Sequence, residues 1–407
     1  MRILMVSDVY FPRVNGVSTS IRTYREDLAA LGHTCELVAP EYPHRTGPDG
    51  AHVTRVRSRG VPRDPEDRMM ARGELRRATA RFKRGDIDVV HIQTPFVAHY
   101  AGLELARRLA VPVVESYHTY FERYLYHYVP MLPAGWMKAL ARRFTLSQCH
   151  EVDAVISPSR PMADALRAYG VRTRIDVLPT GLDPGRFVAG DRMRFRAARG
   201  IAGSRPVALF VGRVAHEKNI DFLLQMLVSL RREMPDILFV LAGEGPALPH
   251  CQELVRSLGL EASVLFVGNM DRDTELLDCY AAADVFVFAS RTETQGLVLL
   301  EAMAQGTPVV STAVMGTAEV LAGTSGSVVV EERSEAFVAA ITSLLRDPVR
   351  RAALSAAARV DAAGWSSRAM ANKLVSLYES VTQVCDVTPL SSARHRSVAA
   401  TAENPAA

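Results

Sequence analysis

Short runs of apolar and β-branched residues alternate along the chain with segments whose apolar residues recur at helical spacing. This alternation is typical of βαβ units with parallel sheets. In the first half it predicts strands "RILMVS", "CELVAP", "DVVHIQ", "PVVES", "DAVISPS" and "RIDVLP", with helices over 18–31 and 101–110. The second half repeats the pattern with strands "PVALFVG", "LFVLAGEG", "SVLFVGN", "VFVFAS", "PVVST" and "GSVVV", and with helices over 220–233, 250–258, 274–282 and after "RTETQG".

The stretch "LPTGLDPGRFVAGD", Leu178 to Asp191, separates the two halves and contains two Pro and three Gly residues, which is typical of an interdomain linker. We therefore expect an α/β protein with two doubly wound domains, at 1–180 and 181–364. A final amphipathic helix is predicted over 365–385. The last segment, 386–407, is small and polar, and we expect it to be a disordered tail.

A length of 407 residues, with 48% hydrophobic and 23% charged residues, fits two soluble globular domains. The apolar run in the first segment, "MRILMVSDVYFP", is too short for the apolar region of a signal peptide. No apolar run in the sequence is long enough to span a membrane. We therefore expect a cytoplasmic protein. The five cysteines lack CxxC spacing, which argues against a disulfide framework and a zinc site.

Charge is divided unevenly between the halves. Residues 1–180 carry 26 Lys and Arg against 19 Asp and Glu, whereas 181–407 carry 22 against 25. The basic excess gathers between Arg55 and Arg84, where it could face an anionic membrane or simply be solvated. Nucleic-acid binding is disfavoured because no aromatic residue is interleaved with the arginines between Arg55 and Arg81.

A second basic segment, "AGWMKALARRFTLSQ", has the pattern of an amphipathic helix. Its apolar positions recur every four residues, and its cations fall on another side. Such a helix could lie in an anionic membrane interface, or its apolar stripe could pack against the core. The residues concerned are Trp136, Leu140 and Phe144 on the stripe, and Lys138, Arg142 and Arg143 on the basic side.

Ligands of open αβ sheets bind beyond the carboxyl ends of the strands, so residues just after strands are the first candidates for chemistry. In the first half, Gly16 lies in a loop before a helix expected to begin near Ser18, where backbone N–H groups could meet a phosphate. His118 follows the strand "PVVES". Six aromatic residues nearby could form an apolar acceptor wall, an interfacial belt or a packed loop: Tyr117, Tyr120, Phe121, Tyr124, Tyr126 and Tyr128.

In the second half, Arg213 follows a strand directly, and Lys218 stands five residues later before a helix. Two fixed cations there could neutralise a diphosphate, or they could pair with Glu217. The glycines of "LAGEGPAL" do not complete a GxGxxG fingerprint. Two DxD strings, at 86–88 and 271–273, are interpreted as turn and cap residues rather than metal ligands.

The stretch "RTETQGLVLLEAMAQGTPVVST" presents a puzzle, because it places the carboxylate of Glu301 in an apolar helix. A lone buried charge costs several kcal/mol unless it has a partner. Either the helix shows that edge to solvent, or Glu301 faces a ligand.

Glu293 and Glu301, separated by seven residues, combine with "NGV", "GRVAHEK" and His118 into an ordered set. This set resembles the retaining nucleotide-sugar glycosyltransferases of family 4, which have the GT-B fold of two Rossmann-like domains facing across a cleft. The resemblance covers about residues 1–385. The strings "TETQGL" and "SYHTYFERYLYHYVP" look most like the membrane-associated enzymes that glycosylate diacylglycerol.

The resemblance implies a role for each motif residue. Arg213 and Lys218 would hold the donor diphosphate, and Gly16 would let backbone amides reach it from the other domain. Glu301 would bind the ribose hydroxyls. Glu293 would hold the sugar, together with backbone N–H groups near Gln295, Gly296 and Leu297, while His118 would contact the sugar near the reacting centre.

Further expectations follow from the same resemblance. Helix 365–385 would cross back to the first domain. The donor would be a UDP- or GDP-sugar, the chemistry would need no metal or other cofactor, and the acceptor would be a membrane lipid such as diacylglycerol at the inner face of the cell membrane. A phosphoinositide, a soluble sugar or a polysaccharide intermediate remains an alternative acceptor, and a non-catalytic sugar-binding subunit is a further alternative. Gln295, where many members carry Phe, leaves the sugar open.

Overall fold

The computed structural model describes residues 1–43, 49–50, 52–61, 64–118 and 134–387. Its N-terminal half is built on a parallel sheet with strand order β3-β2-β1-β6-β7-β8-β9. The strands are β1 (Arg2–Val6), β2 (Thr34–Pro40), β3 (Val53–Val56), β6 (Val89–Ile92), β7 (Val113–Ser116), β8 (Ala154–Ser157) and β9 (Arg174–Val177).

Each face of this sheet carries its own hydrophobic core, because successive strand residues point to opposite faces. Leu4 and Val6 of β1 pack with one set of helices, and Ile3 and Met5 pack on the other side. The first face is covered by α2 (Arg72–Thr79), α3 (Val97–Leu109), α5 (Ala134–Cys149) and α6 (Arg160–Tyr169), and the second by α1 (Gly16–Ala30) and α15 (Ser367–Val387).

The C-terminal half has a second parallel sheet, with strand order β12-β11-β10-β13-β14-β15. Its strands are β10 (Val207–Val211), β11 (Leu238–Ala242), β12 (Val264–Gly268), β13 (Val285–Phe288), β14 (Val309–Ser311) and β15 (Ser327–Val329). Its helices are α7 (Arg192–Ala198), α8 (Ile220–Glu233), α9 (Leu248–Ser257), α10 (Glu275–Ala282), α11 (Leu297–Ala304), α12 (Gly316–Leu321), α13 (Ser334–Arg346) and α14 (Pro348–Ala363), with the 3₁₀ turns η1 (Pro184–Phe187) and η2 (His216–Lys218).

Several elements had no counterpart in the sequence prediction. The antiparallel hairpin of β4 (Ser58–Val61) and β5 (Asp64–Met70) lies in the arginine-rich stretch, where no strand had been predicted. Helices α2, α6, α7, α12, α13 and α14 were also unassigned. The proposed disordered tail falls almost wholly on residues outside the described ranges.

The chain crosses between the domains twice, and the two crossing segments lie side by side. Leu182 and Ser366 form a β-bridge, with Leu182 N–H donating to the carbonyl of Trp365 at 2.7 Å. A Cβ on Gly181 would lie 2.3 Å from the Cα of Ser367, so only glycine fits this contact. The crossing is therefore tightly fixed.

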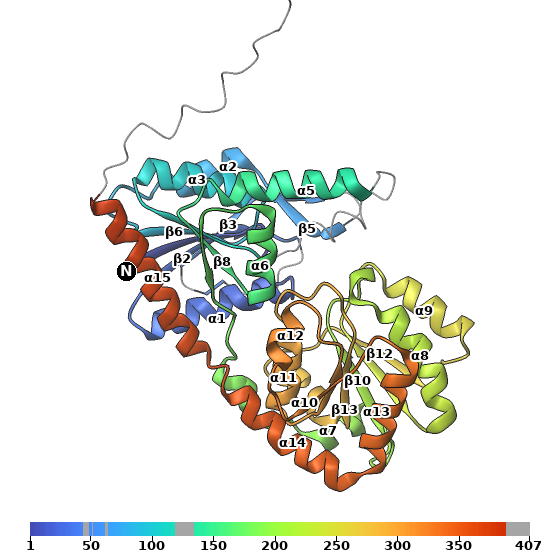
Figure 1. The fold of residues 1–407 in the computed structure, drawn as a ribbon. Coiled ribbons are helices and arrows are strands. Elements are labelled where there is room, and N and C mark those ends of the chain that lie inside the picture. The colour runs from blue at the N-terminus through green and yellow to red at the C-terminus, as the bar shows by residue number, and fades with distance from the viewer. Residues whose placement is uncertain (44–48, 51, 62–63, 119–133, 388–407) are drawn as a thin grey trace, which may run out of the picture.

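After the second crossing, α15 runs back along the N-terminal domain and packs against α1 (Figure 1). The hydroxyl of Tyr378 lies 2.6 Å from Nδ1 of the buried His91 on β6. The last helix thus belongs structurally to the first domain.

Candidate active site

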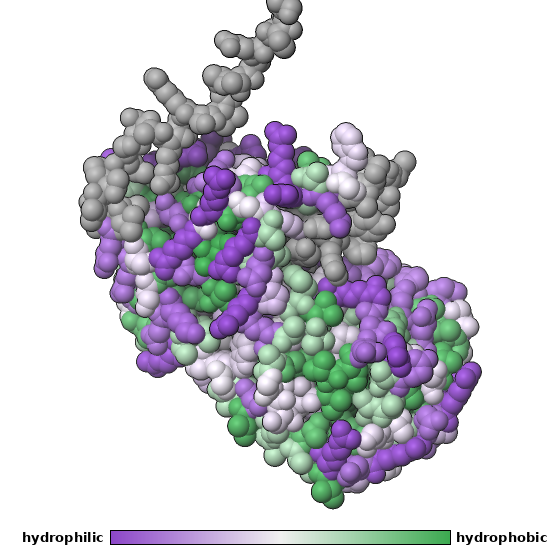
Figure 2. Space-filling view, in the orientation of Figure 1, coloured by the Kyte–Doolittle hydropathy of each residue, from purple (hydrophilic) through white to green (hydrophobic). Residues whose placement is uncertain are grey.

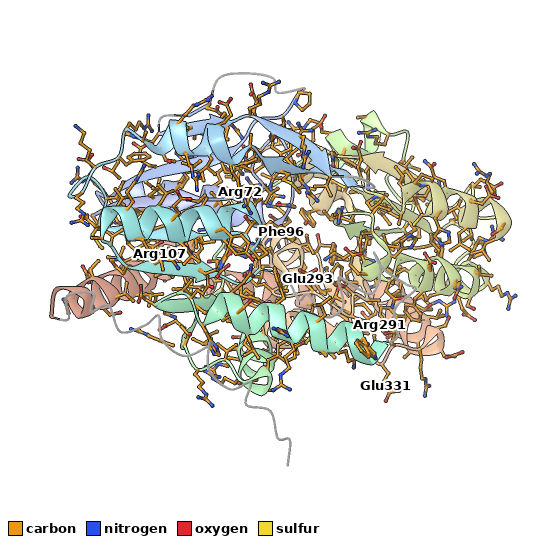
Figure 3. All side chains as sticks on the ribbon, turned by 90° about the horizontal axis from the view of Figure 1, so that it is seen from above. Arg72, Phe96, Arg107, Arg291, Glu293 and Glu331 are labelled. Carbon is orange, nitrogen blue, oxygen red and sulfur yellow. The ribbon has the colours of Figure 1, made fainter. Side chains whose placement is uncertain are left out.

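A cleft of about 700 Å³ opens between the two domains. Glu293, labelled in Figure 3, lies between them. The structure brings together all the site residues proposed from the sequence, and each lines this cleft: Gly16, His118, Arg213, Lys218, Glu293, Gln295, Gly296, Leu297 and Glu301.

The N-terminal wall of the cleft is the first turn of α1. Asn15 is its N-cap, and its Oδ1 accepts a hydrogen bond of 2.8 Å from the Ser18 N–H. Gly16 is consequently the first helical residue, not a loop residue as expected. A Cβ at Gly16 would have no atom within 4 Å. The N-terminal end of α1 therefore lines the cleft without an intervening side chain at Gly16, in the position where a helix favours an anion.

On the opposite wall, Lys218 and Glu293 form an ion pair, with Nζ and Oε2 2.5 Å apart. Lys218 ends η2, just before α8, and Glu293 lies in the loop after β13. Arg213 lies 3.8 Å from Glu217, the partner that the alternative interpretation named. Both cations thus pair with acids of the same wall, and all four residues line the cleft.

Glu301 is neither solvent-facing nor unpartnered. Its side chain is 3% exposed, and its carboxylate bonds the guanidinium of Arg272 and the hydroxyl of Tyr280, the latter at 2.9 Å. Such partners offset the cost of burying the charge. Glu301 and Arg272 both line the cleft.

Sequence reasoning missed Arg272, the central residue of the "DRD" string. Only the acids of that string had been weighed, although Arg272 follows β12 at the carboxyl edge, the position that singled out Arg213. The acids of both DxD strings have protein partners, some of them distant in the chain, such as Arg186 for Asp273. Asp271 accepts hydrogen bonds from the Asp273 N–H and the Thr274 hydroxyl, and Asp88 accepts one from the Arg2 N–H.

The side chain of Gln295 has a partner that the sequence did not indicate, while the role expected of the backbone N–H groups near it stays a prediction. Its side chain is buried, and both ends of its amide bond the backbone of Thr180, in the first crossing segment. Gln295 therefore connects the two domains, and its amide is not directed at a sugar.

The glycines of "LAGEGPAL" serve packing between neighbouring loops. A Cβ on Gly243 would lie 2.0 Å from the carbonyl oxygen of Gly212, and one on Gly245 would lie 2.4 Å from that of Val214. Close backbone approach between the loops after β10 and β11 thus explains both residues.

His118 follows β7, and its Nε2 lies 3.3 Å from Oε1 of Gln93. Burial lowers the pKa of His118 from 6.5 to about 4, so the imidazole is neutral at pH 7. Of the six aromatic residues nearby, Tyr117 is buried in the N-terminal core, with its hydroxyl 2.9 Å from Thr145 Oγ1. The other five lie outside the described residues.

Within the described ranges, no group of three or more His, Cys, Asp or Glu side chains is arranged to hold a metal ion. Across the same ranges, no helix is long and apolar enough to cross a membrane.

The lowered pKa of His118 predicts a defined pH effect on stability. Between pH 6.5 and about 4 the unfolded chain binds a proton at this imidazole and the native state does not, so stability falls as pH falls. The melting temperature of His118→Asn should fall less than that of the wild type from pH 7 to pH 5. His91, whose pKa burial lowers to about 3, acts in the same direction in both proteins. Parallel curves would contradict the assignment.

Comparison with known families identifies both halves. The family described as glycosyltransferase family 4 matches residues 14–186, and that of glycosyl transferases group 1 matches residues 191–361. Among solved structures, sucrose-phosphate synthase from Thermosynechococcus elongatus superposes with a TM-score of 0.77 at 21% identity, over 95% of this chain and 100% of that one.

Two curated relatives align over most of the chain. An alpha-monoglucosyldiacylglycerol synthase of Streptococcus pneumoniae is 34% identical over 76% of this chain and 71% of the relative. A GDP-mannose-dependent alpha-mannosyltransferase of Mycobacterium tuberculosis is 31% identical over 76% and 79%. Together with the two facing parallel-sheet domains, these likenesses establish that the chain belongs to the family 4 glycosyltransferases and has the GT-B fold, and that it is a nucleotide-sugar glycosyltransferase.

Proposed function

We propose that the protein transfers a hexosyl group, with retention of configuration, from a UDP- or GDP-sugar to a hydroxyl group of a membrane glycerolipid such as diacylglycerol. The observation that carries the proposal is the cleft itself. The start of α1 on one domain and the Lys218–Glu293 pair on the other line a single cavity. A sugar nucleotide carries a diphosphate that the start of α1 and Lys218 can bind, and sugar hydroxyls that Glu293 can bind.

In the proposed complex, Arg213 and Lys218 bind the diphosphate on one side, and the N–H groups at Gly16 bind it on the other. Glu301 accepts hydrogen bonds from the ribose hydroxyls. Glu293, already bonded to Lys218, holds hydroxyls of the sugar beside the diphosphate. The Lys218–Glu293 pair therefore contacts both groups joined by the bond that breaks, Lys218 the diphosphate and Glu293 the sugar.

The chemistry requires breaking the bond between the sugar's anomeric carbon and the diphosphate oxygen. The acceptor oxygen then bonds the same carbon on the same face, and the departing diphosphate takes the acceptor's proton. Lys218 and Arg213 stabilise the negative charge that develops on the leaving group. Neutral His118 can accept a hydrogen bond from the sugar but has no proton to spare as an acid. We propose that no metal or other cofactor takes part.

Two features support retention and a lipid acceptor. Both relatives are named for alpha-linked products, and a hexosyl group that leaves an α-linked donor and ends α-linked has kept its configuration. The pneumococcal relative is named for a diacylglycerol product.

The surface around α5 supports a membrane location. Trp136 is 77% exposed and Leu140 is 56% exposed, so the first half of the apolar stripe does not pack against the core, whereas Phe144 does in part. Phe96, at the end of α3 nearer the C-terminal domain in Figure 3, is 50% exposed. Hydrophilic side chains project beside these helices (Figure 2). Exposed aromatics beside basic residues are suited to an anionic interface at the inner face of the cell membrane.

Part of the basic excess does not contribute to that surface. Arg55 is used internally, with bonds to Asp49 and to the carbonyls of Pro40 and Phe11. Arg76 pairs with Glu104 on α3. The proposed membrane contact therefore depends more on α5 than on the arginine-rich stretch.

Donor binding is tested by melting the protein with UDP-glucose, GDP-mannose and ADP-glucose. One sugar nucleotide should raise the melting temperature of the wild type, because a ligand stabilises the state that binds it. Lys218→Met removes a cation from the diphosphate and should lower kcat/KM by about 100-fold or more. Lys373→Met, an exposed lysine on α15 outside the cleft, is the control and should match the wild type. No shift with any donor would refute the proposed function.

Membrane association is tested by flotation with vesicles of phosphatidylglycerol and phosphatidylcholine. Replacing both Trp136 and Leu140 with Gln should release most of the protein from the vesicles, because it removes exposed apolar area from the proposed interface. Val360→Gln on α14, also an exposed apolar residue at 74%, is the matched control and should float like the wild type. Equal flotation of all three proteins would exclude this surface as the lipid contact.

A further inference from the structure

The amide of Gln295 makes two hydrogen bonds to the backbone of a single residue. Its Nε2 donates to the carbonyl of Thr180 at 2.6 Å, and its Oε1 accepts from the N–H of Thr180 at 2.8 Å. Gln295 is 6% exposed and Thr180 is 4% exposed. The two residues are 115 positions apart, one in the loop that carries Glu293 and the other in the first crossing segment.

Thr180 is bonded in turn to α1. Its Oγ1 donates to the hydroxyl of Ser20 at 2.8 Å, and the hydroxyl of Tyr24 donates to the carbonyl of Pro179 at 3.1 Å. Ser20 and Tyr24 are buried residues of α1, the helix whose first turn lines the cleft. A continuous set of hydrogen bonds thus runs from the Glu293 loop through Thr180 to the opposite wall.

The backbone of the same loop is held on two further sides. The Ser159 hydroxyl of the N-terminal domain donates to the carbonyl of Thr294 at 2.7 Å. The Gly316 N–H donates to the carbonyl of Glu293 at 2.9 Å, and a Cβ on Gly316 would lie 2.2 Å from the carbonyl oxygen of Thr294. The loop is therefore held from both domains, and the two bonds to Thr180 link it to α1.

We propose that Gln295 is a positioning residue, which holds the Glu293 loop and the start of α1 at the separation needed to bind one donor from both sides. The functional part of this inference rests on the proposed function. The amide is required because it supplies one donor and one acceptor to two buried backbone groups. An apolar side chain leaves both groups unpaired, and a carboxylate can bond the N–H but faces the carbonyl with another acceptor.

This chemistry makes Gln295→Glu a pH-dependent variant. A protonated carboxyl group has one carbonyl acceptor and one O–H donor, as the amide does, and it can restore both bonds. The dissociation constants of UDP-glucose and GDP-mannose should be measured by calorimetry from pH 8 to pH 5. Gln295→Met should raise the dissociation constant of the donor that binds by at least about tenfold at every pH. Gln295→Glu should raise the dissociation constant at pH 8, and the constant should return toward the wild-type value as pH falls. A flat profile for Gln295→Glu, or wild-type affinity in Gln295→Met, would overturn the proposal.

Gln305 offers a matched control at the other end of α11. It is equally buried, and its amide bonds the carbonyls of Arg186 and Val188 and the N–H of Gly190. These partners lie after the crossing, and Gln305 does not line the cleft. Gln305→Glu should lower the melting temperature without any pH-dependent change in donor affinity. A pH profile like that of Gln295→Glu would show that the effect is not specific to the cleft.

A distance measurement tests the positioning role without any donor. Spin labels at Lys83 and Gln252, exposed residues on different domains, report the separation of the two halves by pulsed electron resonance. Cys35, Cys149, Cys251 and Cys279 are buried and should not be labelled, and Cys385 on α15 is replaced by Ser in every labelled protein. Gln295→Met should give a broader or longer distance distribution than the wild type. An unchanged distribution would overturn the positioning role even if donor binding is confirmed. A changed distribution without donor binding would support the interdomain bond and refute only the proposed function.

Discussion

The arrangement of the cleft depends on the place where the chain passes twice between its domains. Leu182 and Ser366 lie in a β-bridge there, and Gly181 allows the two segments to touch. Parallel strands end at one edge of a sheet, so each domain has one edge where loops can form a site. The paired crossing holds the two sheets so that the loops after β10, β12 and β13 line the same cavity as the start of α1. Without that constraint, each domain would offer only half a binding site.

The charges of the cleft are compensated before any ligand enters. Lys218 pairs with Glu293, Arg213 with Glu217, and the guanidinium of Arg272 with Glu301. A charge taken out of water is costly without a partner, which gives each pair a structural reason to exist. In the complex proposed above, the diphosphate would share these cations with their acids. The free energy of donor binding is thus the gain from the new contacts minus the cost of rearranging the existing ion pairs, not the gain alone.

The sequence was informative where local chemistry decides the structure. Buried parallel strands are continuous apolar runs, so "PVALFVG" and "VFVFAS" could be identified directly, as could polar residues such as Arg213 that follow them. The extent of α8 was also predicted correctly, as Ile220–Glu233. The GT-B architecture expected from the motif set is confirmed.

Long-range partners could not be predicted in the same way. Nothing near Gln295 in the chain indicates a bond to Thr180, and nothing near Arg272 indicates the carboxylate of Glu301. The hairpin β4–β5 was missed because its residues are arginine-rich and lack apolar alternation. The two bonds depend on contacts between segments far apart in the chain, within the C-terminal domain for Arg272 and between the domains for Gln295.

In the proposed complex, one donor molecule contacts both domains at once. Hydrogen–deuterium exchange, compared with and without the sugar nucleotide that stabilises the protein, tests it most directly. A single donor should slow exchange both in the first turn of α1, residues 16–20, and in the segment 293–301. Slower exchange confined to 293–301, with α1 unchanged at saturating donor, would contradict it.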